Sequence, residues 1–197
     1  NPHGLNGGPV FSPDVKRLYF YQLKSPWATS DMNTYYVEKN DNGEWSTKPI
    51  NVGEPYNTSG QDYSPIFTQN GVAYKNLFGK IAKFTYTDNK FSFTDSIVIQ
   101  KGSIQAWNFY MSPNEQYVIF SDRKKGGYGD FDLYISFKTD KDKWGEPINM
   151  GDKINTSTRE RFPMVSPDGK YLFFMRHTET QDFFWVSTDI IDELKKH

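Results

Sequence analysis

The feature that most constrains this chain is a long internal repeat. The segment at 49–53, Pro-Ile-Asn-Val-Gly, recurs at 147–151 as Pro-Ile-Asn-Met-Gly, and an Asn-Thr-Ser sequence follows each copy. A second motif, a turn of the Ser-Pro-Asp type, begins at positions 12, 68, 112 and 166, the copy at 68 being degenerate. A period of about 50 residues is typical of arrays in which one supersecondary unit is repeated. We therefore predict a tandem-repeat architecture.

Each repeat is predicted to consist of four short antiparallel strands. Pro, Asp and Gly in the Ser-Pro-Asp-Gly turn favour a tight reversal between the first two strands. An apolar run such as 171–175 forms the second strand, and 184–187 is a third. A hairpin leads to a fourth strand, which carries an aromatic residue: Trp45, Phe91 or Trp144. The aromatic share of 17% suits pleated, half-buried surfaces. Such units are the blades of a β-propeller.

The predicted fold is therefore all-β, with propeller blades over 1–187 and repeats that start near 9, 63, 107 and 160. The last repeat lacks a fourth strand, because a short α-helix is expected over 188–197. Capping side chains precede this helix at 187–189, and Ile190, Ile191 and Leu194 form one apolar face. We expect the helix to pack against the propeller rim. Use as a membrane or partner helix is the alternative.

Composition and motifs argue against several function classes. The formal charge of −1 provides no bulk basic face for nucleic acid. The absence of cysteine excludes disulfides and thiolate chemistry, and no apolar run is long enough to span a membrane. The three histidines, His3, His177 and His197, form no metal motif and accompany no Gly-x-Ser-x-Gly elbow. We predict no cofactor, metal or catalytic residue. The alternative is a pair of catalytic carboxylates of the glycosidase type, with which the 24 acidic residues of the sequence are compatible.

Three runs, at 121–136, 144–151 and 166–174, resemble the TolB-like or WD-like propeller repeat of bacterial envelope proteins. The resemblance extends from 9 to 187 and is weakest in the second repeat, where Gln69 replaces the proline and Phe91 the tryptophan. It implies a periplasmic, outer-membrane or cell-surface location in a Gram-negative bacterium, in some cases with a lipid anchor. It also implies a binding scaffold with six or more blades. We therefore expect that N-terminal blades are missing, with a compact four-bladed ring as the alternative.

A ligand is expected on one face of the blades. Since successive strands alternate in direction, the loops after the second and fourth strands emerge together, and they are longer than the Ser-Pro-Asp turns opposite. Long loops on a rigid scaffold often carry function, and arginine and aromatic residues are typical of binding hot spots. The predicted binding residues are Trp27, Arg123, Tyr128, Arg159 and Arg161. In the alternative interpretation, the three arginines only join neighbouring blades through ion pairs.

The sequence thus predicts a non-catalytic binding or scaffold module of the cell envelope that recognises a protein or glycan through the long-loop face. The alternative is a carbohydrate-active or hydrolase-associated propeller domain. The oligomeric state is left open. Asn57 and Asn155 match the glycosylation pattern, but they recur as part of the blade motif. We therefore assign them a structural role.

Overall fold

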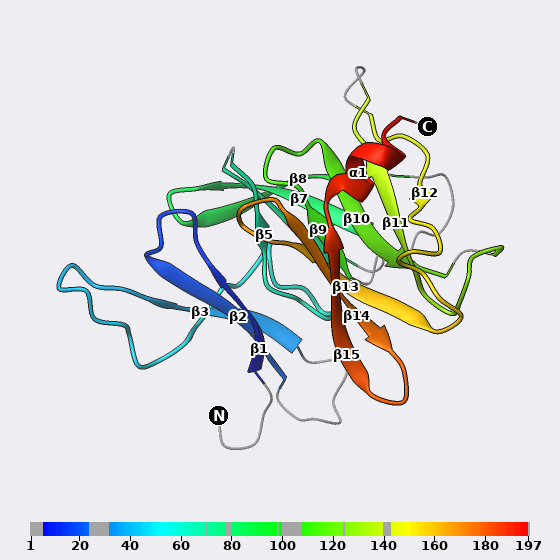
Figure 1. Ribbon diagram of the computed structural model, residues 1–197. Helices are drawn as coiled ribbons and strands as arrows, with labels where there is room; N and C mark the ends of the chain where they lie inside the picture. The colour runs from blue at the N-terminus through cyan, green and yellow to red at the C-terminus, as the bar shows by residue number, and fades with distance from the viewer. Residues whose placement is uncertain are drawn as a thin grey trace. The chain divides into compact units, whose positions relative to one another are not determined.

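The computed structural model describes residues 6–23, 32–69, 71–77, 80–97, 99, 108–123, 125–139 and 143–196. Over these residues the fold is all-β, with four small antiparallel sheets and one short helix near the C-terminal end (Figure 1). It divides into two compact units, 1–96 and 97–197. The four sheets are the blades of a β-propeller, so the predicted fold class is confirmed.

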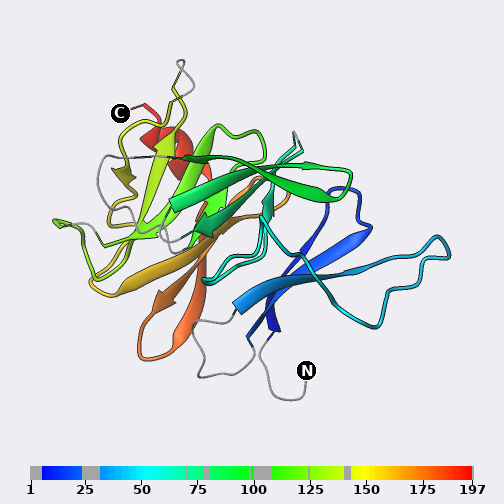
Figure 2. The ribbon, with the colours of Figure 1, turned by 180° about the vertical axis from the view of Figure 1, so that it is seen from behind.

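Unit 1 contains two four-stranded blades in which each strand pairs with the next along the chain. Blade 1 consists of β1 (Asn6–Phe11), β2 (Arg17–Leu23), β3 (Met32–Glu38) and β4 (Ile50–Asn51). Blade 2 consists of β5 (Ile66–Phe67), β6 (Val72–Leu77), β7 (Lys80–Thr87) and β8 (Lys90–Ile97). Figure 2 shows the long β7–β8 hairpin from behind.

Unit 2 contains one four-stranded and one three-stranded blade. Blade 3 consists of β9 (Phe109–Met111), β10 (Tyr117–Asp122), β11 (Asp132–Phe137) and β12 (Ile148–Asn149). Blade 4 consists of β13 (Arg159–Val165), β14 (Tyr171–His177) and β15 (Gln181–Ser187), and α1 (Asp189–Leu194) follows. The prediction that the last repeat lacks its fourth strand is confirmed.

The helix α1 packs against unit 2 through its apolar face. Ile191 is buried in the core, and Ile190 and Leu194 pack against the same cluster. Thr188 makes no side-chain cap, because it donates its hydroxyl to the carbonyl of Gly169. The hydroxyl of Ser187 instead accepts the N–H of Asp189, the first residue of the helix, at 3.3 Å. No helix in the described part of the chain is long and apolar enough to cross a membrane.

The Ser-Pro-Asp motif closes the turn between the first two strands of a blade. The backbone N–H groups of Ser12, Ser112 and Ser166 each donate to the carbonyl of the residue that begins the next strand, at 2.8, 3.0 and 2.8 Å. In the first and last copies the serine hydroxyl also donates to the aspartate two residues later, Asp14 or Asp168, at 2.6 Å. The three turns therefore define equivalent positions in blades 1, 3 and 4.

The hydrogen bonds within these turns affect the pKa values of their aspartates. The hydroxyl of Ser166 lowers the pKa of Asp168 below its ordinary value of 3.8, and Ser12 does the same for Asp14. Because the folded-state pKa is lowered, the stabilising contribution is present above the unfolded-state pKa and is lost as the pH falls through the folded-state value. In an NMR titration, Ser166→Ala should return the pKa of Asp168 toward 3.8 while that of Asp14 stays unchanged. Unchanged titration of Asp168 would show that the hydroxyl does not cause the shift.

The fourth strands are shorter than predicted in blades 1 and 3. Trp45 and Trp144 lie outside β4 and β12, and they form isolated antiparallel bridges with Lys39 and Lys138. A proline precedes each of these two-residue strands. Because proline has no N–H to donate to a sheet, the ladder is interrupted between the tryptophan and the strand.

Within each unit, the core lies between the two blades. The core of unit 1 is largely aromatic and comprises Tyr19, Tyr56, Ala73, Ala82, Phe84 and Phe91. The core of unit 2 is mainly aliphatic, with Ile119, Leu133 and Ile135 of blade 3 packed with Val165, Leu172 and Phe174 of blade 4. Facing blades thus bury one apolar side each.

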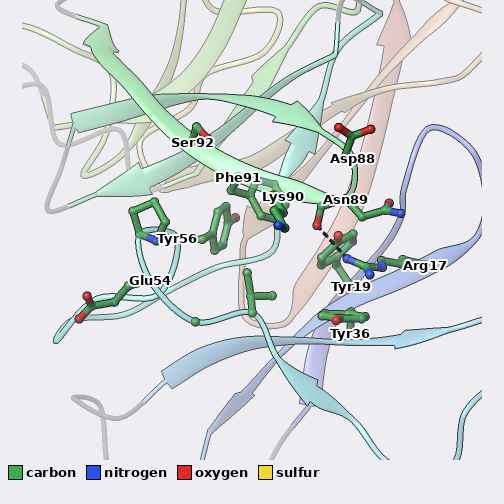
Figure 3. A pocket seen from close by; sticks show the side chains of 13 residues that line it. Arg17, Tyr19, Tyr36, Glu54, Tyr56, Asp88, Asn89, Lys90, Phe91 and Ser92 are labelled. Atoms are coloured by element: carbon green, nitrogen blue, oxygen red, sulfur yellow. Dashed lines mark hydrogen bonds between the residues drawn. The ribbon is translucent and has the colours of Figure 1, made fainter.

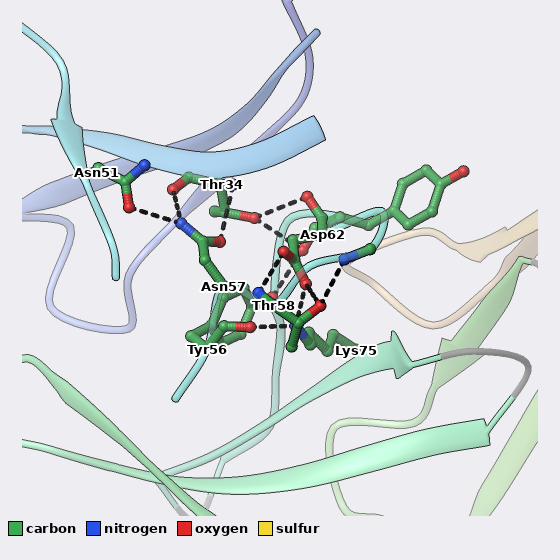
Figure 4. Close-up of polar contacts among 9 residues, drawn as sticks. Thr34, Asn51, Tyr56, Asn57, Thr58, Asp62 and Lys75 are labelled. Atoms are coloured by element: carbon green, nitrogen blue, oxygen red, sulfur yellow. Dashed lines mark hydrogen bonds and ion pairs between the residues drawn. The ribbon is translucent and has the colours of Figure 1, made fainter. Parts of the chain in front are cut away.

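A repeated polar network lies beside each core. The buried amide of Asn57 accepts a hydrogen bond from the N–H of Thr34 at 3.0 Å and donates to the Thr34 carbonyl at 2.9 Å (Figure 4). Asn155 makes the same pair of bonds with Leu133, at 2.7 and 2.9 Å. The structural role predicted for both asparagines is confirmed.

The same network contains, in each unit, an ion pair whose carboxylate is fully buried. Asp62 pairs with Lys75 in unit 1, and Glu160 pairs with Arg176 in unit 2. Each cation also donates to a backbone carbonyl of the segment that enters the blade, Tyr56 for the lysine and Ile154 for the arginine. The two pairs use different residues for the same connection between a blade and the segment before it.

Candidate functional site

The structure places the predicted binding residues at different points of unit 2. Arg123 and Tyr128 lie between β10 and β11, as expected for a long loop. Arg159 and Arg161 lie on β13 rather than in a loop, which corrects the prediction. The strand begins early because Arg159 and Arg161 pair with His177 and Met175 of β14. Trp27 lies outside the described residues.

Two of the arginines converge on one carboxylate. The Nε atom of Arg123 lies 2.8 Å from Oδ1 of Asp130, and the Nε atom of Arg159 lies 2.6 Å from Oδ2 of the same residue. The side chains of Arg123 and Arg159 remain 56% and 46% exposed. Two arginines therefore share one carboxylate, and both arginine side chains are about half exposed.

The third arginine joins this group through an aromatic ring. The guanidinium carbons of Arg123 and Arg161 lie 4.4 and 4.8 Å from the ring centroid of Phe131. Arg161 also donates from Nε to the side-chain oxygen of Asn108 at 3.0 Å. Tyr128 lies in the same loop, with half of its surface exposed. We call Arg123, Tyr128, Arg159 and Arg161 the arginine cluster.

A buried carboxylate holds the loop that carries this cluster. Asp132 is 1% exposed. It accepts hydrogen bonds from the backbone N–H groups of Tyr128 at 2.7 Å and Gly129 at 2.9 Å, and from the Asn149 side chain at 2.9 Å. A Cβ atom at Gly129 would lie 2.2 Å from the carbonyl oxygen of Thr158, so only glycine permits this close approach. The loop is thus anchored to the blade.

Sequence reasoning missed the residues that organise the cluster. Asp130, Phe131 and Asp132 belong to a run that was recognised as a repeat motif, but none of them was singled out. The available signal was the Gly-Gly-Tyr-Gly-Asp sequence at 126–130, in which closely spaced glycines indicate a constrained loop.

The cluster is suited to binding anions, and it also has a structural component. The pair between Arg159 and Asp130 joins blade 4 to the loop of blade 3, as the alternative interpretation expected. Guanidinium groups present planar donors that match carboxylate or phosphate. No group of three or more metal-ligating side chains occurs among the described residues.

Unit 1 contains a second candidate site, a pocket of about 420 Å³ between its blades (Figure 3). The rings of Tyr19, Tyr36, Tyr56 and Phe91 line it together with Arg17 and the turn at 88–90. Arg17 lies 4.1 Å above the Tyr36 ring and donates to the Asn89 carbonyl at 2.8 Å. Burial raises the pKa of Tyr19, so its hydroxyl is neutral and can act as donor or acceptor. Aromatic walls with a few polar groups are typical of small-ligand pockets.

No family model matches the chain. No curated protein sequence matches it either. Solved structures do match. An Agrobacterium tumefaciens protein described as TolB is 17% identical, with a TM-score of 0.57 over 94% of this chain and 59% of the other. The GH93 α-L-arabinofuranosidase of Fusarium graminearum, in complex with arabinobiose, is 15% identical, with a TM-score of 0.53 over 93% and 61%. A Bacteroides fragilis protein described as a 6-phosphogluconolactonase is 16% identical, with a TM-score of 0.50 over 93% and 55%.

These likenesses support the propeller fold. The chain spans 55% to 61% of the length of these three proteins. Their descriptions name different activities on one fold, and a fold of this kind carries many unrelated functions. Function must therefore be argued from the sites of this chain.

Proposed function

We propose that this chain is a binding module without enzymatic activity, and that the arginine cluster of unit 2 contacts a carboxylate-bearing protein or glycan. The observation that carries the proposal is the charge imbalance at Asp130, where one carboxylate meets two guanidinium groups that are about half exposed. An arriving carboxylate would find donors that are already oriented.

Preorganisation supports this assignment. Asp132 and the closely packed Gly129 fix the loop, so few degrees of freedom would be lost on binding. The ring of Phe131 supports two of the guanidinium groups, and Tyr128 offers an exposed aromatic surface beside them. The TolB likeness and the resemblance of the repeats support a place in the bacterial envelope.

The test uses a synthetic glutamate-rich peptide and an oligogalacturonate as probes, with a neutral glycan for comparison. The double variant Arg123→Ala/Arg159→Ala should weaken binding of a charged probe at least about tenfold, since a charge-assisted hydrogen bond contributes about 1.5–3 kcal/mol. Trp27→Ala tests the remaining predicted residue in the same titration. Lys153→Ala is the matched control, because it removes an exposed cation elsewhere in unit 2. Equal affinities for the double variant and the control would refute the proposal.

The pocket of unit 1 supports a second candidate, a carbohydrate-active domain. Its tyrosine rings and polar turn could accommodate one or two sugar residues, and the structural neighbour from Fusarium graminearum is a glycosidase in complex with arabinobiose. Release of reducing sugar from an arabinan, abolished by Tyr36→Ala, would favour this second function over the first.

A further inference from the structure

Asp130 contacts two members of the arginine cluster through the same edge of the guanidinium group. Its Oδ1 atom lies 2.8 Å from Nε of Arg123, and its Oδ2 atom lies 2.6 Å from Nε of Arg159. Arg123 also donates from Nη2 to Oδ2 at 3.2 Å. Two guanidinium groups together carry more N–H donors than one carboxylate can accept. Asp130 therefore orients both arginines without satisfying all of their donors.

The backbone fixes Asp130 beside Arg159, although the two residues belong to different blades. The N–H of Asp130 donates to the carbonyl of Thr158 at 2.9 Å, and the N–H of Glu160 donates to the carbonyl of Phe131 at 2.7 Å. Phe131 and Arg159 form a parallel bridge beside these hydrogen bonds. The position of the aspartate is therefore set by backbone pairing as well as by its ion pairs.

Contact through Nε leaves the outer edge of a guanidinium group, formed by its two terminal nitrogens, suited to a second carboxylate. Because one aspartate orients both groups, their outer edges have a defined separation. A ligand with one carboxylate can occupy one edge, and a ligand with two carboxylates can occupy both. Binding of the second carboxylate is then intramolecular, which raises the affinity when the spacing of the two acids matches the site.

We propose that Asp130 is a positioning residue for a glycan that carries carboxylates on successive sugar rings, an oligouronate. This inference rests on the proposed function and narrows the ligand to one class. Carboxylates on joined sugar rings keep their spacing, whereas the glutamate side chains of an acidic peptide lose rotamer freedom when they are fixed. Tyr128 lies in the same loop with half of its surface exposed, and it offers a ring against which a sugar can pack.

Amide NMR titrations with monogalacturonate and digalacturonate test the role of Asp130. The unaltered chain is expected to bind digalacturonate at least about tenfold more tightly than monogalacturonate, and Asp130→Asn should reduce this preference to less than about threefold. Loss of a negative charge by itself would strengthen the binding of both anions. A selective loss of digalacturonate affinity therefore separates positioning from simple electrostatics. Glu193→Gln, which removes a 56% exposed carboxylate elsewhere in unit 2, is the matched control and should keep the preference.

Two further measurements separate positioning from disruption of the loop. The N–H groups of Tyr128 and Gly129 donate to Asp132, so both should stay protected from hydrogen exchange in Asp130→Asn. Arg159→Lys keeps the positive charge, but an ammonium group has no second edge to offer a ligand while it contacts Asp130. This variant should therefore also lose the preference for digalacturonate, and it decides the question if Asp130→Asn disturbs the loop.

The possible failures are distinguishable. A preference for digalacturonate that survives Asp130→Asn with an intact loop, or that survives Arg159→Lys, overturns the positioning role. The proposed function then still stands if Arg123→Ala/Arg159→Ala weakens binding. A diglutamate peptide that binds as tightly as digalacturonate overturns the choice of ligand class. If the unaltered chain binds none of these acids, the proposed function fails and this inference fails with it.

Discussion

Lys75→Met is expected to destabilise unit 1 by about 3–5 kcal/mol, because it leaves a buried carboxylate without its cation. The side chains of Lys75 and Asp62 are both 0% exposed. Burial lowers the pKa of Lys75, and the hydrogen bond to Asp62 opposes that shift. The ammonium also lies 4.5 Å from the centroid of the Tyr56 ring and donates to the Tyr56 carbonyl. Methionine supplies none of these interactions.

A double-mutant cycle separates the pair from its surroundings. Asp62→Ala should be similarly costly, because Thr58 also loses the carboxylate that accepts its N–H at 2.6 Å and its hydroxyl at 3.0 Å. The double variant should cost clearly less than the two single variants together, since no buried charge is left unpaired.

Hydrogen exchange followed by mass spectrometry is the suitable measurement, because it reports the opening of unit 1 and unit 2 separately. Lys153→Met is the matched control: its pair with Glu193 is 73% and 56% exposed, and such pairs contribute about 0–1 kcal/mol. Strictly additive costs, or a Lys75→Met variant as stable as the control, would contradict the predicted role of the pair.

Asn155→Ala is expected to destabilise unit 2 by about 3 kcal/mol, because a buried N–H left unsatisfied costs about 1–3 kcal/mol and further hydrogen bonds are lost with it. Asn155 is 1% exposed, and its side-chain oxygen accepts the N–H of Leu133. This N–H lies past the point where β12 ends, so the strand itself offers it no acceptor. Its amide also donates to Oδ1 of Asn149 at 2.8 Å, and that oxygen accepts the N–H of Gly151. One side chain therefore replaces the missing part of a two-residue strand.

The repeat provides an internal replicate of this experiment. Asn57→Ala should have the same effect on unit 1, because Asn57 makes the equivalent bonds to Thr34 and Asn51. Asn114→Ala, on an exposed turn, is the control and should change stability by less than about 0.5 kcal/mol. The free energy of unfolding is measured with a chemical denaturant. If Asn114→Ala lowers it as much as the two buried variants do, the buried amides do not take over the hydrogen bonds of the missing strand residues.

Several features of the fold could be predicted because they depend on local pattern. Turn chemistry located the reversals at 12, 112 and 166, and the apolar runs that follow each turn located the second and third strands. The candidate site was predictable only in part. The loop between β10 and β11 was recognised, but the extension of β13 to Arg159 depends on its pairing with β14, which continues across a register shift between Arg161 and Met164.

By itself, the sequence determined the repeat, the blade architecture, the missing fourth strand of the last repeat and the C-terminal helix, because each rests on spacing and short-range conformational preference. Tertiary structure alone decided the pairing of Asp62 with Lys75, of Glu160 with Arg176, and of two arginines with Asp130. Alternation specifies the side of a strand on which a residue lies. Which partner it meets depends on register and on the packing of the neighbouring blade, and one sequence does not encode these in any local signal.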